Sequence, residues 1–328
     1  AIGAMAAGVA LGVMTNLTSL WTTFEYSAES LRGKSELSAE FAAKNLGRET
    51  SSGMDKSAIF AWAHTKMETF TLFIPSFMGG SSSQLMYNEK GTETEKTFRQ
   101  IAQSGVPEQF LQNLAYSTGR YWGRQAFTAG PIYYGVVLFF LMILGIVSMR
   151  SPLRWGLAGV LFFFVVLSWG ADFAFFNNFM VDYFPFYNKF RDVKMTLVVG
   201  QGAAVVLACF ALQRLWQQSK DEAQQPQAER NVMIATAIMA GLCLFALMYS
   251  MGGDISKQNP SYAENLEAIR KQAPQAADFM ERLESAMQVD RAALMQNDAL
   301  KSLLLVLLAG GALWVAARRR FGITMPLG

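Results

Sequence analysis

Residues 232–251 read VMIATAIMAGLCLFALMYSM and contain no charged side chain. A helix of about 20 such residues, rising about 1.5 Å per residue, covers the roughly 30 Å of hydrocarbon in a bilayer. Further apolar stretches of this kind are residues 1–20, 131–149, 155–171, 195–213 and 302–317. The sequence therefore predicts a mainly α-helical, polytopic membrane protein with about six transmembrane helices.

The composition agrees with a membrane location. Hydrophobic residues make up 52% of the chain and charged residues only 16%, which is more apolar than an ordinary soluble domain. No nucleotide-binding loop, Ser-His-Asp arrangement or basic nucleic-acid patch is present in the sequence. Cys209 and Cys243 lie inside predicted spans without CxxC spacing, which favours apolar packing over a disulfide or a zinc site.

Basic residues in the short connections predict the orientation. Arg150 and Arg154 flank the connection between the second and third spans, and residues 318–320 are three arginines directly after the sixth. The positive-inside rule places both groups in the cytoplasm of a bacterial inner-membrane protein. The expected organisation is a first span (1–20), a periplasmic region (21–130), spans two to five (131–251), a periplasmic helical segment (252–300), and the sixth span with the start of a further segment (301–328).

The long segments have their own patterns. Residues 92–118 carry apolar side chains at helical spacing, which predicts one or two amphipathic helices over the membrane surface. Residues 172–193 are rich in Phe and Tyr, and aromatic rings favour the headgroup level, so this segment is predicted to lie at the outer interface. Residues 259–300 are predicted to be helical and to run into the last span. Apolar sequence at both ends predicts that the chain is part of a longer protein.

Short strings along most of the chain resemble signature stretches of the YfhO family of bacterial membrane proteins. They are EYS at 25–27, RGKSEL at 32–37, ETFTLFIP at 68–75, GGSS at 79–82, YWG at 121–123, LSWG at 167–170, YNKFR at 187–191, DR at 290–291 and DAL at 298–300. The family is similar to the GT-C glycosyltransferases, which move a sugar from a polyprenyl-phosphate carrier to an acceptor outside the cytoplasm. The resemblance implies a GT-C-like fold, the central portion of a large Bacteroidetes-type member, and a principal catalytic acid upstream of Ala1.

Three carboxylates are candidates for a supporting catalytic role. Glu68 is preferred because it lies four residues after His64, on the same face of a predicted helix, and leads into an aromatic segment. Glu25 and Asp55 are weaker candidates. A solvated helix face is the alternative for Glu68, and a structural role is the alternative for His64. No acidic cluster has metal-ligand spacing, so no cofactor is assigned, and a divalent metal ion stays an open alternative.

The second group of candidates would bind the lipid-linked sugar. Arg191 and Lys189 follow the aromatic segment, where a lipid phosphate would lie, and such cations suit a phosphate. Tyr187 and Asn188 are candidates to hydrogen-bond the sugar, and Trp122 to stack on it. The alternatives are interfacial snorkelling for the cations and membrane anchoring for the aromatic rings.

The sequence leaves two functions open for this protein. The first is a membrane glycosyltransferase whose partners are a polyprenyl-phosphate-linked sugar, a cell-envelope acceptor and membrane lipid, with no nucleic acid. The second is a non-catalytic transporter or scaffold for envelope lipid or polysaccharide assembly. The predicted spans carry no ionisable residue near their centres, which counts against a proton-coupled transporter.

Overall fold

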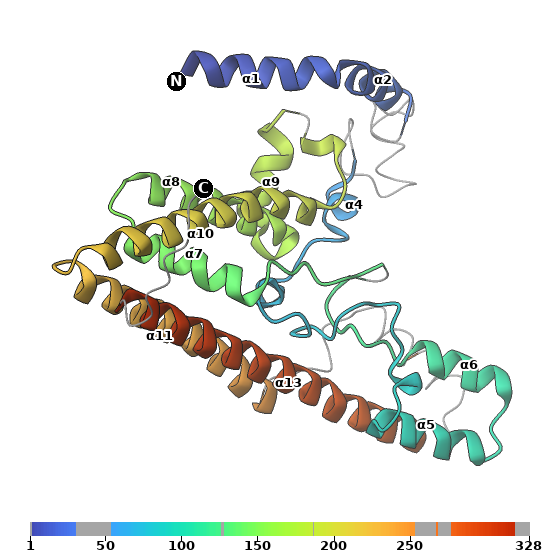
Figure 1. The fold of residues 1–328 in the computed structure, drawn as a ribbon. Helices are drawn as coiled ribbons and strands as arrows, with labels where there is room; N and C mark the ends of the chain where they lie inside the picture. The colour runs from blue at the N-terminus through green and yellow to red at the C-terminus, as the bar shows by residue number, and fades with distance from the viewer. Residues whose placement is uncertain are drawn as a thin grey trace. The chain divides into compact units, whose positions relative to one another are not determined.

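The structure is a computed structural model of the chain, and it describes residues 2–30, 54–125, 128–185, 187–252, 267 and 277–318. Across these ranges the chain is mainly helical and has no β-strand, which confirms the predicted class. Figure 1 labels the helices along the chain. The chain divides into two compact units. Unit 1 comprises Ala1–Ala63 and Phe173–Val193, and unit 2 comprises His64–Asp172 and Lys194–Gly328.

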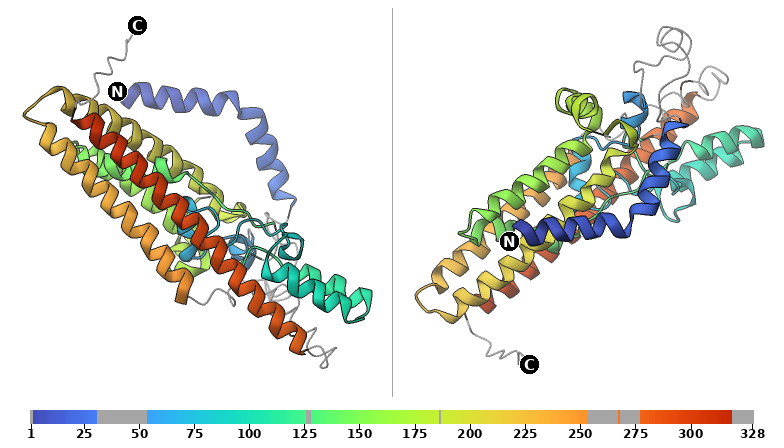
Figure 2. Two further views of the ribbon diagram at one scale, coloured as in Figure 1. Left: turned by 60° about the horizontal axis from the view of Figure 1, so that its bottom comes forward. Right: turned by 90° about the horizontal axis from the view of Figure 1, so that it is seen from above.

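Unit 2 contains a bundle of long apolar helices. Its members are α7 (Val136–Ser148), α8 (Leu153–Ser168), α10 (Leu197–Lys220), α11 (Gln225–Gly252) and α13 (Ala277–Ala317). Helices α11 and α13 lie side by side along their lengths, and α10 packs on both α7 and α8 (Figure 2). The connections α7–α8 and α10–α11 are short, so these neighbours run antiparallel.

Small residues let the helices of the bundle approach closely. A Cβ added to Gly145 of α7 would lie 2.4 Å from the carbonyl oxygen of Leu207 in α10, so only glycine fits there. The buried positions of α10 include four alanines: Ala203, Ala204, Ala208 and Ala211. Such interfaces are typical of membrane helices, because lipid offers apolar side chains as good an environment as another helix does.

Three helices are long and apolar enough to cross a membrane: Val193–Lys220, Gln225–Gly252 and Ala277–Ala317. A fourth results only if Leu153–Ser168 and the bent continuation Gly170–Tyr183 count as one span. Helix α7 is apolar but has only 13 residues. The chain is therefore a membrane protein, while the count of about six spans stays a prediction. The predicted first span, residues 1–20, is divided between α1 (Ile2–Thr15) and α2 (Leu17–Ala28), both in unit 1.

The basic residues of the short connections gather at one end of the bundle. An Arg154 Nη1 atom donates to the carbonyl oxygen of Met149 at 2.5 Å. Arg318 pairs with Glu229 at 2.8 Å, and its guanidinium lies 3.6 Å from the Trp314 ring centroid. Such stacking and pairing hold cations at the end of an apolar helix. This grouping is what the predicted orientation requires, although the side of the membrane stays a prediction.

The opposite end of the bundle carries the head region, defined as residues 64–135 together with the first half of α13, residues 277–300. It contains α5 (Glu93–Gln103), α6 (Glu108–Tyr116) and the short 3-10 helices η1 (Met67–Leu72) and η2 (Met86–Asn88). The two helices predicted in residues 92–118 are thus confirmed. Their apolar faces pack against the protein itself, because Ile101 and Leu114 lie in one cluster with Met280 and Met287 of α13; their place over the membrane surface stays a prediction.

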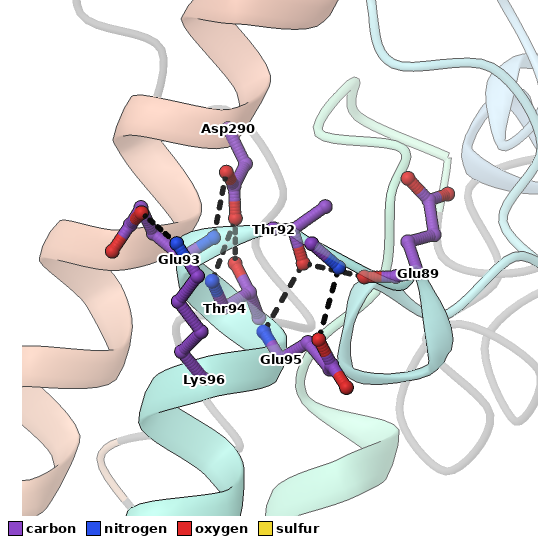
Figure 3. A network of polar contacts seen from close by, with 8 residues as sticks. Glu89, Thr92, Glu93, Thr94, Glu95, Lys96 and Asp290 are labelled. Carbon is purple, nitrogen blue, oxygen red and sulfur yellow. Dashed lines mark hydrogen bonds and ion pairs between the residues drawn. The ribbon is translucent and has the colours of Figure 1, made fainter.

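Figure 3 shows how α13 holds the start of α5. The Asp290 carboxylate accepts hydrogen bonds from the backbone N–H of Glu93 at 3.1 Å, and from the N–H and hydroxyl of Thr94 at 2.7 and 2.6 Å. The Thr92 hydroxyl accepts from the Glu95 N–H at 3.1 Å. The first N–H groups of a helix have no partner within it and favour negative charge. A side chain from a distant helix therefore completes the N-terminus of α5.

Unit 1 has a smaller core of its own. It is formed by α4 (Lys56–Phe60), α9 (Ala174–Tyr183) and the 3-10 turn η4 (Tyr187–Lys189). Ile59, Ala63, Val181 and Val193 are buried in this core. The Met54 N–H donates to the carbonyl oxygen of Asn188 at 3.0 Å, which joins the start of α4 to η4.

Candidate functional site

The candidate site is a buried polar cluster of the head region, centred on Glu68 in η1. Glu68 is only 2% exposed. Its Oε2 atom accepts the Thr65 N–H at 2.6 Å, and its Oε1 atom accepts the Tyr121 hydroxyl at 2.5 Å. Burial raises the pKa of Glu68, and the hydrogen bonds from Tyr121 and Thr65 and the charge of Lys194 oppose that rise in part. A carboxylate with a raised pKa is a stronger base, as general base catalysis near neutral pH requires.

Tyr121 reaches Glu68 because Gly123 follows it. A Cβ on Gly123 would lie 2.0 Å from the Tyr121 hydroxyl, so any other residue would displace the ring. Burial, and next the charge of Glu68, raise the pKa of Tyr121. The hydroxyl therefore keeps its proton and stays a donor to Glu68. The Gln125 N–H donates back to the same hydroxyl oxygen at 3.4 Å.

Lys194 brings a cation into the cluster from the start of the α10 span. It is 8% exposed, and its Nζ donates to the Gln125 Oε1 at 2.6 Å. Its charge acts on Glu68 and also on the buried imidazole of His64. Burial first, and then Lys194, lower the pKa of His64 to about 3, so His64 is neutral at physiological pH. The cluster thus combines an acid and a cation, both removed from water.

Hydrogen bonds join the η1 segment to the end of α8. The His64 N–H donates to the Ser168 carbonyl oxygen at 2.8 Å, and the Trp169 Nε1 donates to the Thr69 hydroxyl at 2.8 Å. The Asp172 carboxylate pairs with Arg124 and accepts the Lys66 N–H. These bonds place Glu68 at the head-region end of the membrane helices. The face predicted for His64 and Glu68 does not form, because α4 ends at Phe60 and η1 begins at Met67.

Trp122 is the other predicted site residue in unit 2. Its side chain is 1% exposed. A Cβ on Gly79 would lie 2.6 Å from its ring. The guanidinium of Arg291, a residue of α13, lies 5.7 Å from the ring centroid. Gly79 has a φ of +86°, which also favours glycine. In this conformation the ring is packed inside the head region, and a sugar would stack on it only after it is uncovered.

The remaining predicted residues lie in unit 1. The Arg191 guanidinium lies 4.3 Å from the Trp62 ring centroid, a cation–π distance. The same unit holds Lys189 and Asn188 in η4, and Asp55 just before α4. Burial raises the pKa of the Tyr187 hydroxyl.

Glu25 lies in α2, where its Oε1 accepts the Trp21 Nε1 hydrogen at 2.8 Å. The predicted residues are therefore divided between the two units. Within unit 2, Glu68 and Trp122 belong to the packed head region. Within unit 1, the Met54–Asn188 backbone bond joins the segment that carries Asp55 to the one that carries Asn188 and Lys189.

Three residues of the cluster were not predicted as site residues: Tyr121, Gln125 and Lys194. The first two fall in or beside the YWG string, so the resemblance carried a signal for them. Lys194 carried none, because a single lysine at the start of an apolar span is typical of interfacial snorkelling. Metal binding has no support here: within the described ranges, no three His, Cys, Asp or Glu side chains form a group that could hold an ion.

Comparison with protein-family models, with curated proteins and with solved structures gave no match. The class that the structure itself defines is a helical membrane protein with at least three candidate spanning helices. At one end of its bundle a packed head region encloses an acid, a tyrosine and a lysine.

Proposed function

We propose that this protein is a membrane glycosyltransferase of the GT-C type, related to the YfhO family. In this proposal it spans the bacterial inner membrane about six times, with its long segments in the periplasm, and transfers a sugar from a polyprenyl phosphate to an envelope acceptor. The observation that carries the proposal is the buried Glu68, with its raised pKa, beside the cation Lys194 at the end of the membrane helices. Such a transfer needs a base and a cation at the level of a lipid phosphate.

The reaction assigns a separate task to each group. The acceptor oxygen attacks the anomeric carbon, the bond from that carbon to the phosphate oxygen breaks, and the phosphate leaves with the electron pair. The ionised carboxylate of Glu68 takes the proton of the acceptor hydroxyl, and Tyr121 orients that carboxylate. Lys194 stabilises the charge that develops on the phosphate.

The unit 1 residues have binding tasks in this proposal. Within unit 1, Arg191 and Lys189 are the residues proposed to bind a lipid phosphate, a role that suits a guanidinium fork and an ammonium group. Tyr187 and Asn188 hydrogen-bond the sugar, and Glu25 and Asp55 are subsidiary carboxylates. Arg191 is exposed and already stacked on Trp62, so its side chain is ordered without being enclosed.

The test measures transfer of radiolabelled sugar from polyprenyl phosphate to envelope material in membranes. Glu68→Gln keeps the shape of the side chain and removes the base, so transfer should fall by about 10²–10⁴-fold. Glu108→Gln, on the polar helix α6, is the matched control and should transfer normally. Tyr121→Phe should lower the rate less, because it removes only the orienting hydroxyl.

Two results would reject parts of this proposal. Full transfer by Glu68→Gln would remove Glu68 from the reaction. If deletion of the gene changed no envelope glycan and caused no lipid-linked sugar to accumulate, the enzyme assignment itself would be wrong, and a transporter or scaffold would be the better description.

A further inference from the structure

Helix α9 in unit 1 exposes a stripe of aromatic side chains. Phe175 is 88% exposed, Phe179 56% and Tyr183 74%. Residues four apart lie on one face of a helix, so these three form a continuous row, and the rings of Phe179 and Tyr183 are 5.1 Å apart. The opposite face carries Met180 and Val181, which are buried. The helix is therefore packed on one side and presents large apolar rings on the other.

One charge interrupts this stripe. Asp182, the single charged residue of α9, is exposed beside Tyr183. The Lys56 Nζ, from α4 of the same unit, lies 2.9 Å from its Oδ2. A lone carboxylate is costly at the edge of hydrocarbon, and pairing with a cation lowers that cost. Lys56 thus neutralises the one charged group of α9.

The residues on either side of α9 in the chain suit a lipid boundary. Before it, the chain leaves the apolar helix α8 at Ser168, at the end opposite the Arg154 connection, and reaches α9 through Gly170–Phe173. Only a short link thus separates α9 from an apolar helix along the chain. After it come Lys189 and Arg191, and cations near an aromatic helix attract anionic headgroups.

We propose that α9 lies in the plane of the membrane, with the row Phe175, Phe179 and Tyr183 inserted at the boundary between headgroups and acyl chains. Lys56 accompanies it to neutralise Asp182. The occupant of this face is the lipid bilayer itself, and the proposal does not depend on sugar transfer. Tyr is enriched at this depth because its hydroxyl stays near water while the ring leaves it, and Phe is typical of the apolar face of an interfacial helix.

The test uses nitroxide labels on the full chain in vesicles of phosphatidylethanolamine and phosphatidylglycerol. Single cysteines are placed by Phe175→Cys, Phe179→Cys and Tyr183→Cys, after Cys209 and Cys243 have been replaced by alanine. Paramagnetic resonance then compares relaxation by oxygen, which concentrates in lipid, with relaxation by a water-soluble nickel chelate. Tyr116→Cys is the matched control, because Tyr116 on α6 is an aromatic residue with 75% exposure outside the stripe.

Labels on α9 should show an oxygen-to-nickel ratio severalfold above that of the control label. Ratios equal to that of the control would place the stripe in water and overturn the proposal. Protection from both reagents would show that a protein surface covers the stripe, which would overturn it as well.

A second variant tests the role of Lys56. Lys56→Gln leaves Asp182 unpaired, so the label at position 179 should move towards water and its ratio should fall. Lys96→Gln is the control, because Lys96 also forms an ion pair of 2.8 Å, with Glu93 on α5, and belongs to unit 2. An unchanged ratio in Lys56→Gln would show that neutralisation of Asp182 is not required and would overturn that part of the proposal.

Discussion

The bundle and the head region of unit 2 are held together in different ways. The bundle buries small residues, and at Gly145 the backbones of α7 and α10 touch. The head region buries the charged side chains of Glu68 and Asp290, and Lys194 joins it from the segment before α10; each has a hydrogen-bonding partner. In lipid, helices associate through close packing, because apolar side chains gain little when they move from lipid into a helix interface. Outside lipid, a buried charge needs partners, and those partners determine which segments meet.

The largest effect is expected where one charge joins two helices of the head region. Asp290→Ala removes the acceptor for two N–H groups and the Thr94 hydroxyl, and leaves them buried without it. The free energy of unfolding should fall by about 3 kcal/mol. Denaturant titration in detergent micelles measures this fall. Asp278→Ala, on the same helix but in an exposed pair with Arg282, should change it by less than about 0.5 kcal/mol. Equal effects of the two variants would contradict this account of the head region.

A smaller effect is expected from one methyl group in the bundle. Gly145→Ala places a Cβ 2.4 Å from the Leu207 oxygen, so α7 and α10 must separate. The expected loss is about 1–3 kcal/mol of unfolding free energy. Gly156→Ala in α8 is the control, because a Cβ there meets nothing within 4 Å, and it should gain up to about 1 kcal/mol from helix propensity. If both substitutions stabilise, close backbone approach does not hold the bundle together.

The third effect depends on pH and belongs to the head region alone. In the folded protein His64 stays neutral down to about pH 3, whereas in the unfolded chain its pKa has the ordinary value of 6.5. The contribution of His64 to the free energy of unfolding is thus complete above pH 6.5. It is lost as the pH falls below that value, at up to about 1.4 kcal/mol per pH unit.

His64→Gln should remove this loss, since His64 is the sole histidine. Unfolding free energies at pH 7.5 and 5.5 measure the slope for both proteins. Glu68 acts with the opposite sign, because its raised pKa favours the folded state at low pH, but that contribution is shared by both proteins and cancels in the difference. Identical slopes would show that His64 is hydrated in the folded protein.

The smallest effect is expected at the boundary between the two regions. Trp169→Phe deletes the hydrogen bond from Nε1 to the Thr69 hydroxyl and keeps most of the ring. The expected cost is about 1 kcal/mol. A double-mutant cycle with Thr69→Val measures the coupling, which should be of the same size. Trp155→Phe is the control, because Trp155 is 61% exposed at the other end of α8. A coupling near zero would mean that this bond does not join the regions.

Much of the bundle could be predicted because its signal is local. An uncharged run such as 232–251 predicts its helix without knowledge of any neighbour, and α11 spans Gln225–Gly252. The amphipathic spacing of residues 92–118 likewise predicted α5 and α6. The segment that packs against them was not predictable, because an apolar helix face indicates that it is covered but does not identify the covering segment. In the structure α13 covers these faces, whereas the spacing alone predicted only helices over the membrane surface.

The candidate site was predicted only in part. Glu68 was preferred because it leads into the aromatic segment that ends at Pro75, and it is the centre of the buried cluster. The helix face that it was expected to share with His64 does not form. Lys194 was missed, since nothing near it in the sequence distinguishes a buried lysine from one at a membrane interface. The need for glycine at positions 123 and 79 is visible only in the structure, where the rings of Tyr121 and Trp122 occupy the space that a Cβ would take.

The sequence by itself determined that this is a helical membrane protein, where its long apolar helices lie, and which of its ends carry the basic residues. Those properties follow from the transfer of single segments between water and lipid, which depends on composition and length alone. The tertiary structure decided that Asp290 completes α5, that α13 carries the head region, and that Glu68 meets Tyr121. Such contacts join residues far apart in the chain, and their energies depend on distance and burial, which exist only once the chain has folded.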